Sequence, residues 1–369
     1  MMKRLVFVFV TAVLLAGCRT PQMPVSPRVV NALEGLPELV DSCGIPVLQY
    51  FYFSPQGDCH GVVVCQDTTF EISQPIDEQS IFQAASLSKP LFAYIVMKML
   101  DRGEIDLDRP IADYTDIDRF EDKEMARRLT PRIVLSHQTG LPNWATSPSS
   151  DEWPTSRITF KYPADSCFAY SGEGYAFLQR AVETIQGQPL DEIARREVFE
   201  PFDMPTTSYA WQPAYDSIAL AGFNRDGENR GQGRHPRANS AYTLRTNATE
   251  YARFLHRGLL NGEGLSEEAH KEMFTPQVHA QRYADEPRAC DSSVFWCLGF
   301  GNVAEPAATG DYFWHWGDNG NFKALWLLHP ATSEGFVYFS NRATGHDLLD
   351  PFLHTLTGED LPLNDWIRN

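Results

Sequence analysis

The segment Ile81-Phe82-Gln83-Ala84-Ala85-Ser86-Leu87-Ser88-Lys89 leads from an apolar stretch into a predicted helix. Apolar side chains then recur at helical spacing, at Phe92, Ile95, Val96, Met99 and Leu100. Residues three apart share one helix face, so Ser86 and Lys89 are expected to touch while Ser88 points away. The amides free at a helix start suit an oxyanion. The segment indicates a nucleophilic serine with a basic partner; the alternative is an ordinary helix start with a solvated lysine.

Strand-like segments rich in Val, Phe, Tyr and Trp gather at both ends of the chain, at 45–53, 61–65, 312–316, 322–329 and 335–340. The middle is helical in pattern, and a second apolar stripe is closed by Gly187. Short strands cannot each bury a face alone, so both ends are expected in one antiparallel sheet. We predict an α+β fold with a single domain over 44–369, its sheet part at about 44–85 and 295–369 and an inserted helical part at about 86–294.

The N-terminus has the pattern of an export signal. Lys3-Arg4 precede an apolar run from Leu5 to Ala16, shorter than the roughly 20 residues that cross a bilayer as a helix. Leu15-Ala16-Gly17-Cys18 is similar to a bacterial lipobox, which implies cleavage and lipidation at Cys18; the alternative is a secretory signal in which Cys18 is incidental. We expect a lipoprotein signal at 1–18, a proline-rich tether at 19–43, and an envelope lipoprotein facing the periplasm or the cell surface.

Composition excludes several classes of function. The net charge of −17 repels phosphate backbones, so nucleic-acid binding is not expected. Neither Cys-x-x-Cys nor His-Glu-x-x-His occurs, so no metal or other cofactor is predicted. Six cysteines remain after Cys18, and their even number permits disulfides whose pairing the sequence leaves open. The oligomeric state is left open as well.

Two further short motifs stand beside predicted elements. Tyr170-Ser171-Gly172 precedes the second amphipathic helix, and His315-Trp316-Gly317-Asp318 ends a predicted strand. Glycine at 317 permits a ligand to approach the strand backbone closely. Taken singly, each motif is more typical of a structural role. An isolated tyrosine is usually a core or interface residue, and a lone histidine in a strand is more often structural than catalytic.

In chain order, Ser86-x-x-Lys89, Tyr170-Ser171-Gly172 and His315-Trp316-Gly317 resemble the three motifs of the serine β-lactamase and penicillin-binding-protein superfamily. The resemblance is to the branch of class C β-lactamases, DD-peptidases and related esterases, with Ser-x-x-Lys, Tyr-Ser-Asn and Lys/His-x-Gly. Further segments match in family order, at 103–110, 135–142, 168–175, 198–205 and 298–301. The resemblance covers roughly residues 44–345.

This resemblance implies roles for the site residues. Ser86 would attack a carbonyl and become acylated, with Lys89 and Tyr170 handling its proton; which of the two is the base stays open. The backbone amides of Ser86 and Asp318 would hold the oxyanion. His315 would orient a substrate carboxylate or help proton transfer, with Gly317 beside the substrate.

Two departures from the family pattern bear on the substrate. Histidine at 315 replaces the usual lysine, and Gly172 replaces the asparagine that in the family binds an acylamido carbonyl. The sequence therefore favours a lipid-anchored envelope serine hydrolase of esters or D-residue peptides. The alternatives are a true β-lactamase and a catalytically silent sensor or scaffold that binds cell-wall fragments. We expect Gly172→Asn to raise β-lactam turnover, provided the helix accepts the side chain.

Overall fold

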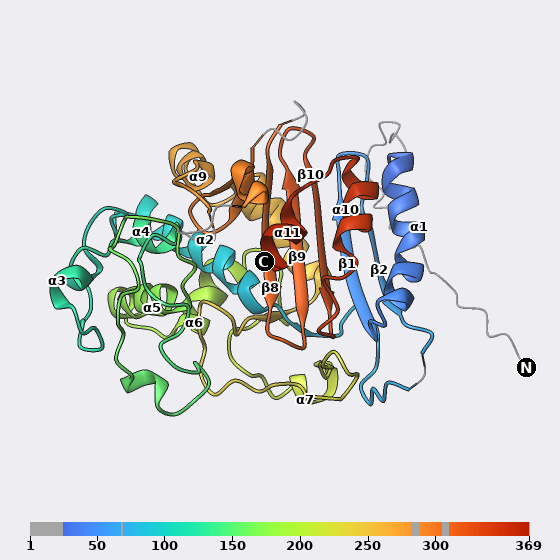
Figure 1. Ribbon diagram of the computed structural model, residues 1–369, viewed down its shortest axis with the longest axis horizontal. Helices are drawn as coiled ribbons and strands as arrows, with labels where there is room; N and C mark the ends of the chain where they lie inside the picture. Colours follow the sequence, from blue (N-terminus) through green and yellow to red (C-terminus); the bar gives the residue numbers. More distant parts are fainter. Residues whose placement is uncertain (1–24, 68, 282–287, 305–309, 369) are drawn as a thin grey trace, which may run out of the picture.

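The computed structural model describes residues 25–67, 69–281, 288–304 and 310–368, and Figure 1 shows a central sheet beside a mainly helical region. In the described part of the chain the sheet has eight strands in the order β2-β1-β10-β9-β8-β7-β6-β5. Neighbouring strands are antiparallel, and β1 from the start of the chain pairs with β10 near its end. The predicted α+β arrangement, with both chain ends in one antiparallel sheet, is confirmed.

The strands agree with the predicted ones at both chain ends. Their bounds are β1 Val47–Phe53, β2 Cys59–Val64, β5 Val278–His279, β6 Val294–Trp296, β7 Gly301–Val303, β8 Tyr312–Asp318, β9 Lys323–His329 and β10 Glu334–Ser340. A separate pair joins β3 Phe82–Gln83 to β4 Arg245–Thr246. The C-terminal part of the sheet thus begins at residue 278, inside the region 86–294 that was predicted to be helical. Strands of two or three residues carry too little alternation for a sequence pattern to reveal them.

The helices of the inserted region surround α2, Ser88–Asp101. The others in this region are α3 Lys123–Ala126, α4 Pro131–Leu135, α5 Gly172–Gln186, α6 Leu190–Ala194, α7 Tyr215–Ile218, α8 Ala248–Arg253 and α9 Glu267–Phe274. Gly187 has φ of 64° and ends α5, as predicted from its position after the apolar stripe. Helix α2 is buried on nearly all sides, which makes it a rigid base for the residues at its start.

Two apolar cores lie on opposite faces of the sheet. One contains the inserted helices and Phe313 of β8, and the other contains Trp314 and Trp316 of the same strand. This alternation follows from the two-residue period of a strand. The second core is covered by α1 Pro27–Ser42, α10 Leu349–Thr357 and α11 Leu363–Arg368. His315 and Gly317 therefore face the inserted helices.

The predicted tether at 19–43 is wrong for most of its length, because residues 27–42 form α1. Val29, Ala32, Leu36 and Val40 give this helix one buried face, which packs beside α10 at the right of Figure 1. Pro27 stands at the first helical position, where proline is tolerated because the amide it lacks would have no intrahelical partner. Residues 1–24, including Cys18 and the predicted signal, lie outside the described residues.

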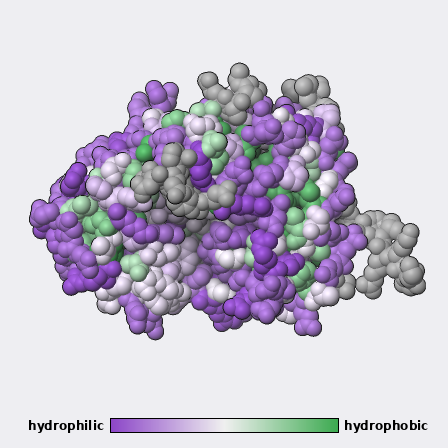
Figure 2. Space-filling model, in the orientation of Figure 1, coloured by the Kyte–Doolittle hydropathy of each residue, from purple (hydrophilic) through white to green (hydrophobic). Residues whose placement is uncertain are grey.

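The described surface is mostly polar. Figure 2 shows a largely hydrophilic face with small, scattered apolar areas. Among the described helices, none is both long and apolar enough to cross a membrane. The six described cysteines are all free thiols.

Candidate active site

Ser86 lies at a sharp turn between β3 and α2, in the one-turn 3₁₀ helix η1, Ala85–Leu87. Ala85 has φ of 50°, a left-handed conformation that costs a residue with a side chain about 1–3 kcal/mol. Strand β8 runs against this turn: a Cβ added to Gly317 would lie 2.4 Å from the carbonyl oxygen of Ala84. Glycine at 317 therefore permits the close approach of β8 to the turn that carries Ser86.

Lys89 contacts Ser86 directly, as the three-residue spacing predicts. Its Nζ donates to the Oγ of Ser86 at 3.2 Å and to the carbonyl oxygen of Ala241 at 2.8 Å. Lys89 is only 1% exposed, and burial lowers its pKa well below the ordinary value, so the neutral amine is favoured. Ser88 points away: its Oγ donates to the carbonyl oxygen of Ala85 at 2.6 Å and accepts from the amide of Leu244 at 3.0 Å.

Tyr170 comes from the segment before α5 and joins the same cluster. The Nζ of Lys89 lies 4.7 Å from the centroid of its ring. The ring of His137 lies 4.2 Å from that of Tyr170, and the ring of His315 lies 6.3 Å away, measured between centroids. Four segments distant in sequence thus bring together a lysine, a tyrosine and two histidines, and the lysine of this cluster contacts Ser86.

Both histidines of this cluster are fully buried and neutral. The Nδ1 of His137 accepts from the amide of Ser171 at 3.0 Å, whereas the Nδ1 of His315 donates to the carbonyl oxygen of Trp316 at 2.7 Å. Burial, together with the nearby Lys89, holds both pKa values well below the ordinary one. A neutral, buried His315 is poorly suited to clamp a substrate carboxylate and is better suited to orient the groups around Tyr170 and Lys89.

A cavity of about 290 Å³ opens above Ser86. Its lining residues are Gln83, Ser86, Lys89, Asn143, Trp144, Pro148, Gly233, His235, Tyr242, Asp318, Asn319 and Asn321. Three of the predicted site residues, Ser86, Lys89 and Asp318, are in this lining. The other four predicted site residues are not in this lining: Tyr170, Gly172, His315 and Gly317. They would therefore act from behind the residues that line the cavity.

Gly172 is covered by an indole ring. A Cβ added to Gly172 would lie 2.3 Å from Cζ2 of Trp144, far inside van der Waals contact. Helix α5 therefore has no room for the side chain of Gly172→Asn, because Trp144 occupies the space that the asparagine would need. The expectation that this single substitution raises β-lactam turnover is withdrawn for that reason.

Several residues of the cavity were not anticipated from the sequence. Asn143 and Trp144 directly follow the family-like segment 135–142, and His137 lies within it, so that segment was the available signal. His235 and Tyr242 come from a loop that no motif marked. Burial and the nearby Arg245 lower the pKa of His235 to about 4, and burial raises the pKa of Tyr242 to about 12. Both side chains are therefore neutral near pH 7.

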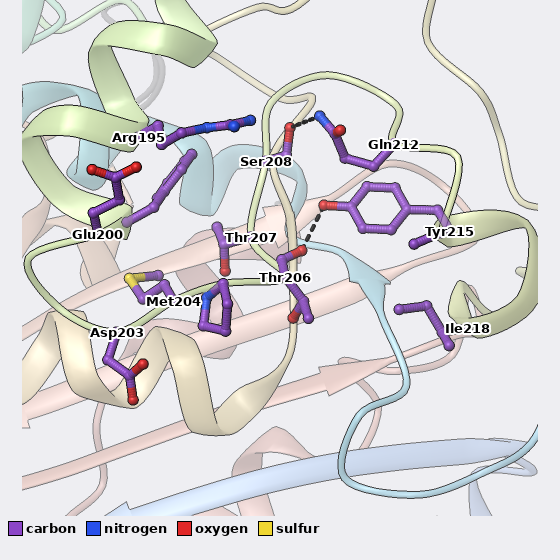
Figure 3. A pocket seen from close by; sticks show the side chains of 13 residues that line it. Arg195, Glu200, Asp203, Met204, Thr206, Thr207, Ser208, Gln212, Tyr215 and Ile218 are labelled. Atoms are coloured by element: carbon purple, nitrogen blue, oxygen red, sulfur yellow. Dashed lines mark hydrogen bonds between the residues drawn. The ribbon is translucent and has the colours of Figure 1, made fainter.

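A larger hollow of about 560 Å³ lies elsewhere, between the segment 195–208 and α7 (Figure 3). Its polar groups bond to each other: Tyr215 donates to the carbonyl oxygen of Thr206 at 2.6 Å, and Gln212 donates to Ser208 at 2.9 Å. None of the three sequence motifs contributes to its lining in the described chain. Size alone is therefore a poor guide here, and the smaller cavity over Ser86 is the candidate site.

The comparison with protein families agrees with this geometry, since the family model named Beta-lactamase matches residues 59–357. The chain belongs to the Beta-lactamase family. This family is one of serine hydrolases that include peptidases, amidases and β-lactamases. Among the described residues, no cluster of three or more His, Cys, Asp or Glu side chains is placed to hold a metal ion.

Curated relatives of this Beta-lactamase family member match over part of their length. Penicillin-binding protein 4 of Amycolatopsis lactamdurans is 31% identical over 137 residues, which are 35% of this chain and 36% of that protein. The D-alanyl-D-alanine-carboxypeptidase/endopeptidase AmpH of Escherichia coli K12 is 23% identical over 146 residues, 36% of this chain and 38% of that protein. The matched segments thus span little more than a third of these relatives.

A solved structure extends the likeness to nearly the whole fold. The D-stereospecific amidohydrolase from Streptomyces sp. superposes with a TM-score of 0.70 at 16% identity, over 90% of this chain and 99% of that one. At this identity the likeness establishes the fold alone.

Proposed function

We propose that this protein is a serine hydrolase that forms an acyl-enzyme on Ser86 and cleaves esters or peptides that contain D-residues. The observation that carries the proposal is the buried Lys89, whose Nζ lies 3.2 Å from the Oγ of Ser86. Its lowered pKa leaves an amine that can accept the serine proton near neutral pH. The names of the relatives, a D-alanyl-D-alanine peptidase and a D-stereospecific amidohydrolase, agree with this substrate class.

In the proposed reaction, the Oγ of Ser86 attacks the substrate carbonyl while its proton passes to Lys89 or Tyr170. The oxyanion is held by the backbone amides of Ser86 and Asp318. Its collapse breaks the bond to the leaving group, which takes up the proton. Water then attacks the acyl-enzyme, gives a proton to the same base, and releases the acid, regenerating the free hydroxyl of Ser86.

The charges of the cavity bear on the choice between substrates. In its described lining, Lys89 is the one lysine and Asp318 the one acid. The carboxylate of Asp318 is already paired with Lys323 and accepts from the amide of Gly320 at 2.7 Å. Because Lys89 is bonded to Ser86 and Ala241 and burial lowers its pKa, a carboxylate on the substrate would gain little from the one lysine of this lining. This favours uncharged esters and internal amide bonds over β-lactams and free C-terminal carboxylates.

One plate of substrates tests this proposal. Purified protein and its Ser86→Ala variant would be assayed on p-nitrophenyl acyl esters, nitrocefin and peptides ending in D-Ala-D-Ala. We expect kcat/KM to be highest for the esters and to vanish in Ser86→Ala. Nitrocefin turnover at the level of a dedicated β-lactamase would make the β-lactamase alternative the better one. Binding of cell-wall fragments without any turnover would favour the silent sensor.

We also propose that Cys18 carries a lipid anchor that holds the protein on the bacterial envelope. Support comes from the sequence, in which a short apolar run ends in Leu15-Ala16-Gly17-Cys18. Starting at residue 27, the described chain folds against the sheet. The segment 19–26 would then be the whole spacer between an anchored Cys18 and the folded domain.

A further inference from the structure

Trp144 forms one wall of the cavity and covers Gly172, the position at which the family pattern has asparagine. Its indole covers Gly172 and also packs edge to face against Tyr242, with ring centroids 5.5 Å apart. Both rings line the cavity over Ser86. The part of the cavity wall beside Gly172 is therefore aromatic.

The loop that carries Trp144 is bound tightly to the start of α5. The carbonyl oxygen of Pro142 accepts from the Oγ of Ser171 at 2.8 Å. The side-chain oxygen of Asn143 accepts from the amide of Gly172 at 2.9 Å, and the carbonyl oxygen of Asn143 accepts from the amide of Glu173 at 3.0 Å. Backbone and side-chain bonds on the residues before Trp144 thus hold it against the helix.

Glu173 completes this attachment from the helix side. Its carboxylate is fully buried and accepts from the amide of Ala145 at 3.0 Å and from the indole N–H of Trp153 at 2.7 Å. Arg119 pairs with the same carboxylate at 3.0 Å. Trp153 in turn packs edge to face on Trp144, with centroids 5.9 Å apart. Buried charge-assisted bonds of this kind fix geometry strongly, so Trp144 is a preorganised surface.

We propose that Trp144 determines substrate specificity, and that it selects a flat, apolar acyl group in place of an acylamido arm. The proposal rests on the function proposed above, because it assigns the substrate class of the same site. An aromatic face gains more from a planar apolar partner than from a polar amide. Gly172 leaves room for the indole of Trp144 because it lacks a side chain, and Glu173 holds the loop that carries Trp144 in place.

We expect the acyl group of the substrate, rather than the leaving group, to pack against Trp144. It stays on Ser86 through both acylation and deacylation, whereas the leaving group departs after the first step. A rigid surface beside Ser86 can therefore act on the acyl group in both steps. An effect of Trp144 on deacylation therefore cannot arise from contact with the leaving group.

The test compares two esters with the same leaving group, p-nitrophenyl acetate and p-nitrophenyl phenylacetate. In Trp144→Ala we expect the phenylacetate-to-acetate ratio of kcat/KM to fall about 10-fold, in the range for an apolar group that loses its pocket. Trp144→Phe should keep most of the ratio. Trp211→Ala is the matched control, because Trp211 lies outside the cavity lining. Decay of the phenylacetyl-enzyme, followed by mass spectrometry, should also change in Trp144→Ala.

The outcomes separate this inference from the proposed function. If Trp144→Ala labels at Ser86 with a fluorophosphonate at the wild-type rate but keeps the wild-type ratio within twofold, the inference is overturned and the hydrolase stands. An equal fall in Trp211→Ala would also overturn it. If wild-type protein neither labels nor turns over esters, the proposed function itself fails. Should Trp144→Ala not fold, Trp144→Leu keeps an apolar side chain without the aromatic face and must lower the same ratio.

Discussion

The Nζ of Lys89 donates to the Oγ of Ser86 at 3.2 Å from a position that is almost completely buried. Burial lowers the pKa of the amine, which favours a neutral base beside the serine over a solvated cation. This pairing distinguishes Ser86 from its neighbours. Ser88 bonds to the backbone of Ala85 and Leu244, and Ser171 caps α5 through its bond to the amide of Gly174.

Acylation should therefore occur at Ser86 alone. A fluorophosphonate or penicillin probe, followed by peptide mapping, is expected to label wild-type protein at Ser86 and to leave Ser86→Ala unlabelled. Ser88→Ala is the matched control in the same motif and should keep its label, with some loss of stability from the buried hydrogen bonds. Label on Ser88 or Ser171 would refute the assignment.

The pH dependence of acylation should reflect the lowered pKa of Lys89. Because the neutral amine is the competent form, kcat/KM for an uncharged ester should rise with pH and reach a plateau well below pH 10.5, the ordinary pKa of lysine. Lys89→Arg keeps a permanent charge and should lose the plateau together with most of the activity. A limb in the wild type centred near pH 10.5 would show that Lys89 is protonated in the resting site.

Tyr170→Phe should slow acylation by roughly 10²- to 10⁴-fold, the usual contribution of a positioned acid or base. The ring contacts with His137 and Lys89 do not need the hydroxyl, so the melting temperature should change little. Single-turnover kinetics and a thermal melt measure the two effects. Unchanged kcat would make Tyr170 a packing residue.

Stability should fall in acid partly because of His346. This ring is buried, its Nδ1 bonds to the hydroxyl of Tyr338 at 2.8 Å, and burial, with a smaller effect of Lys323, lowers its pKa to about 3. The unfolded chain binds a proton here near pH 6.5 while the folded chain does not. The free energy of unfolding therefore decreases as pH falls from about 6.5 towards 3, by up to about 1.4 kcal/mol per pH unit.

Urea unfolding of His346→Gln at pH 7 and pH 5 tests this linkage. The variant should be less stable at pH 7, because it loses the bond to Tyr338, but it should lose less stability on acidification than the wild type. His279→Gln, at an exposed position on β5, should keep the wild-type slope. Equal slopes for wild type and His346→Gln would exclude His346 as a source of the acid sensitivity.

Processing at Cys18 should be sensitive to globomycin, and the mature protein should carry lipid on that cysteine. Cys18→Ser should release the protein from membranes without changing the activity of the folded domain. Membrane fractionation and mass spectrometry of the N-terminal peptide measure these effects. Wild-type protein that is wholly soluble and unmodified at Cys18 would contradict the proposal.

Local patterns were sufficient for the outline of the fold and for the centre of the site. The abundance of Val, Phe, Tyr and Trp placed β1, β2, β8, β9 and β10, and the three-residue spacing predicted the contact of Ser86 with Lys89. Both predictions depend on residues that lie close together along one segment, and the order of residues determines these directly. Helix α1 was missed because Pro27 at its start and Pro37 inside it resemble a proline-rich spacer, and its burial depends on α10.

Contacts between distant segments were decided by the tertiary structure alone. No local pattern near Gly172 indicates that the indole of Trp144 fills the space above it, because the two residues meet only when the loop after α4 bonds to the start of α5. Burial, likewise, is a property of the assembled core. The sequence pointed to Lys89 and His315, but the lowered pKa values of both side chains depend on desolvation by segments far away in the chain. The identity of the nucleophile was thus legible in sequence, whereas the shape and charge of its cavity arise only when the chain folds.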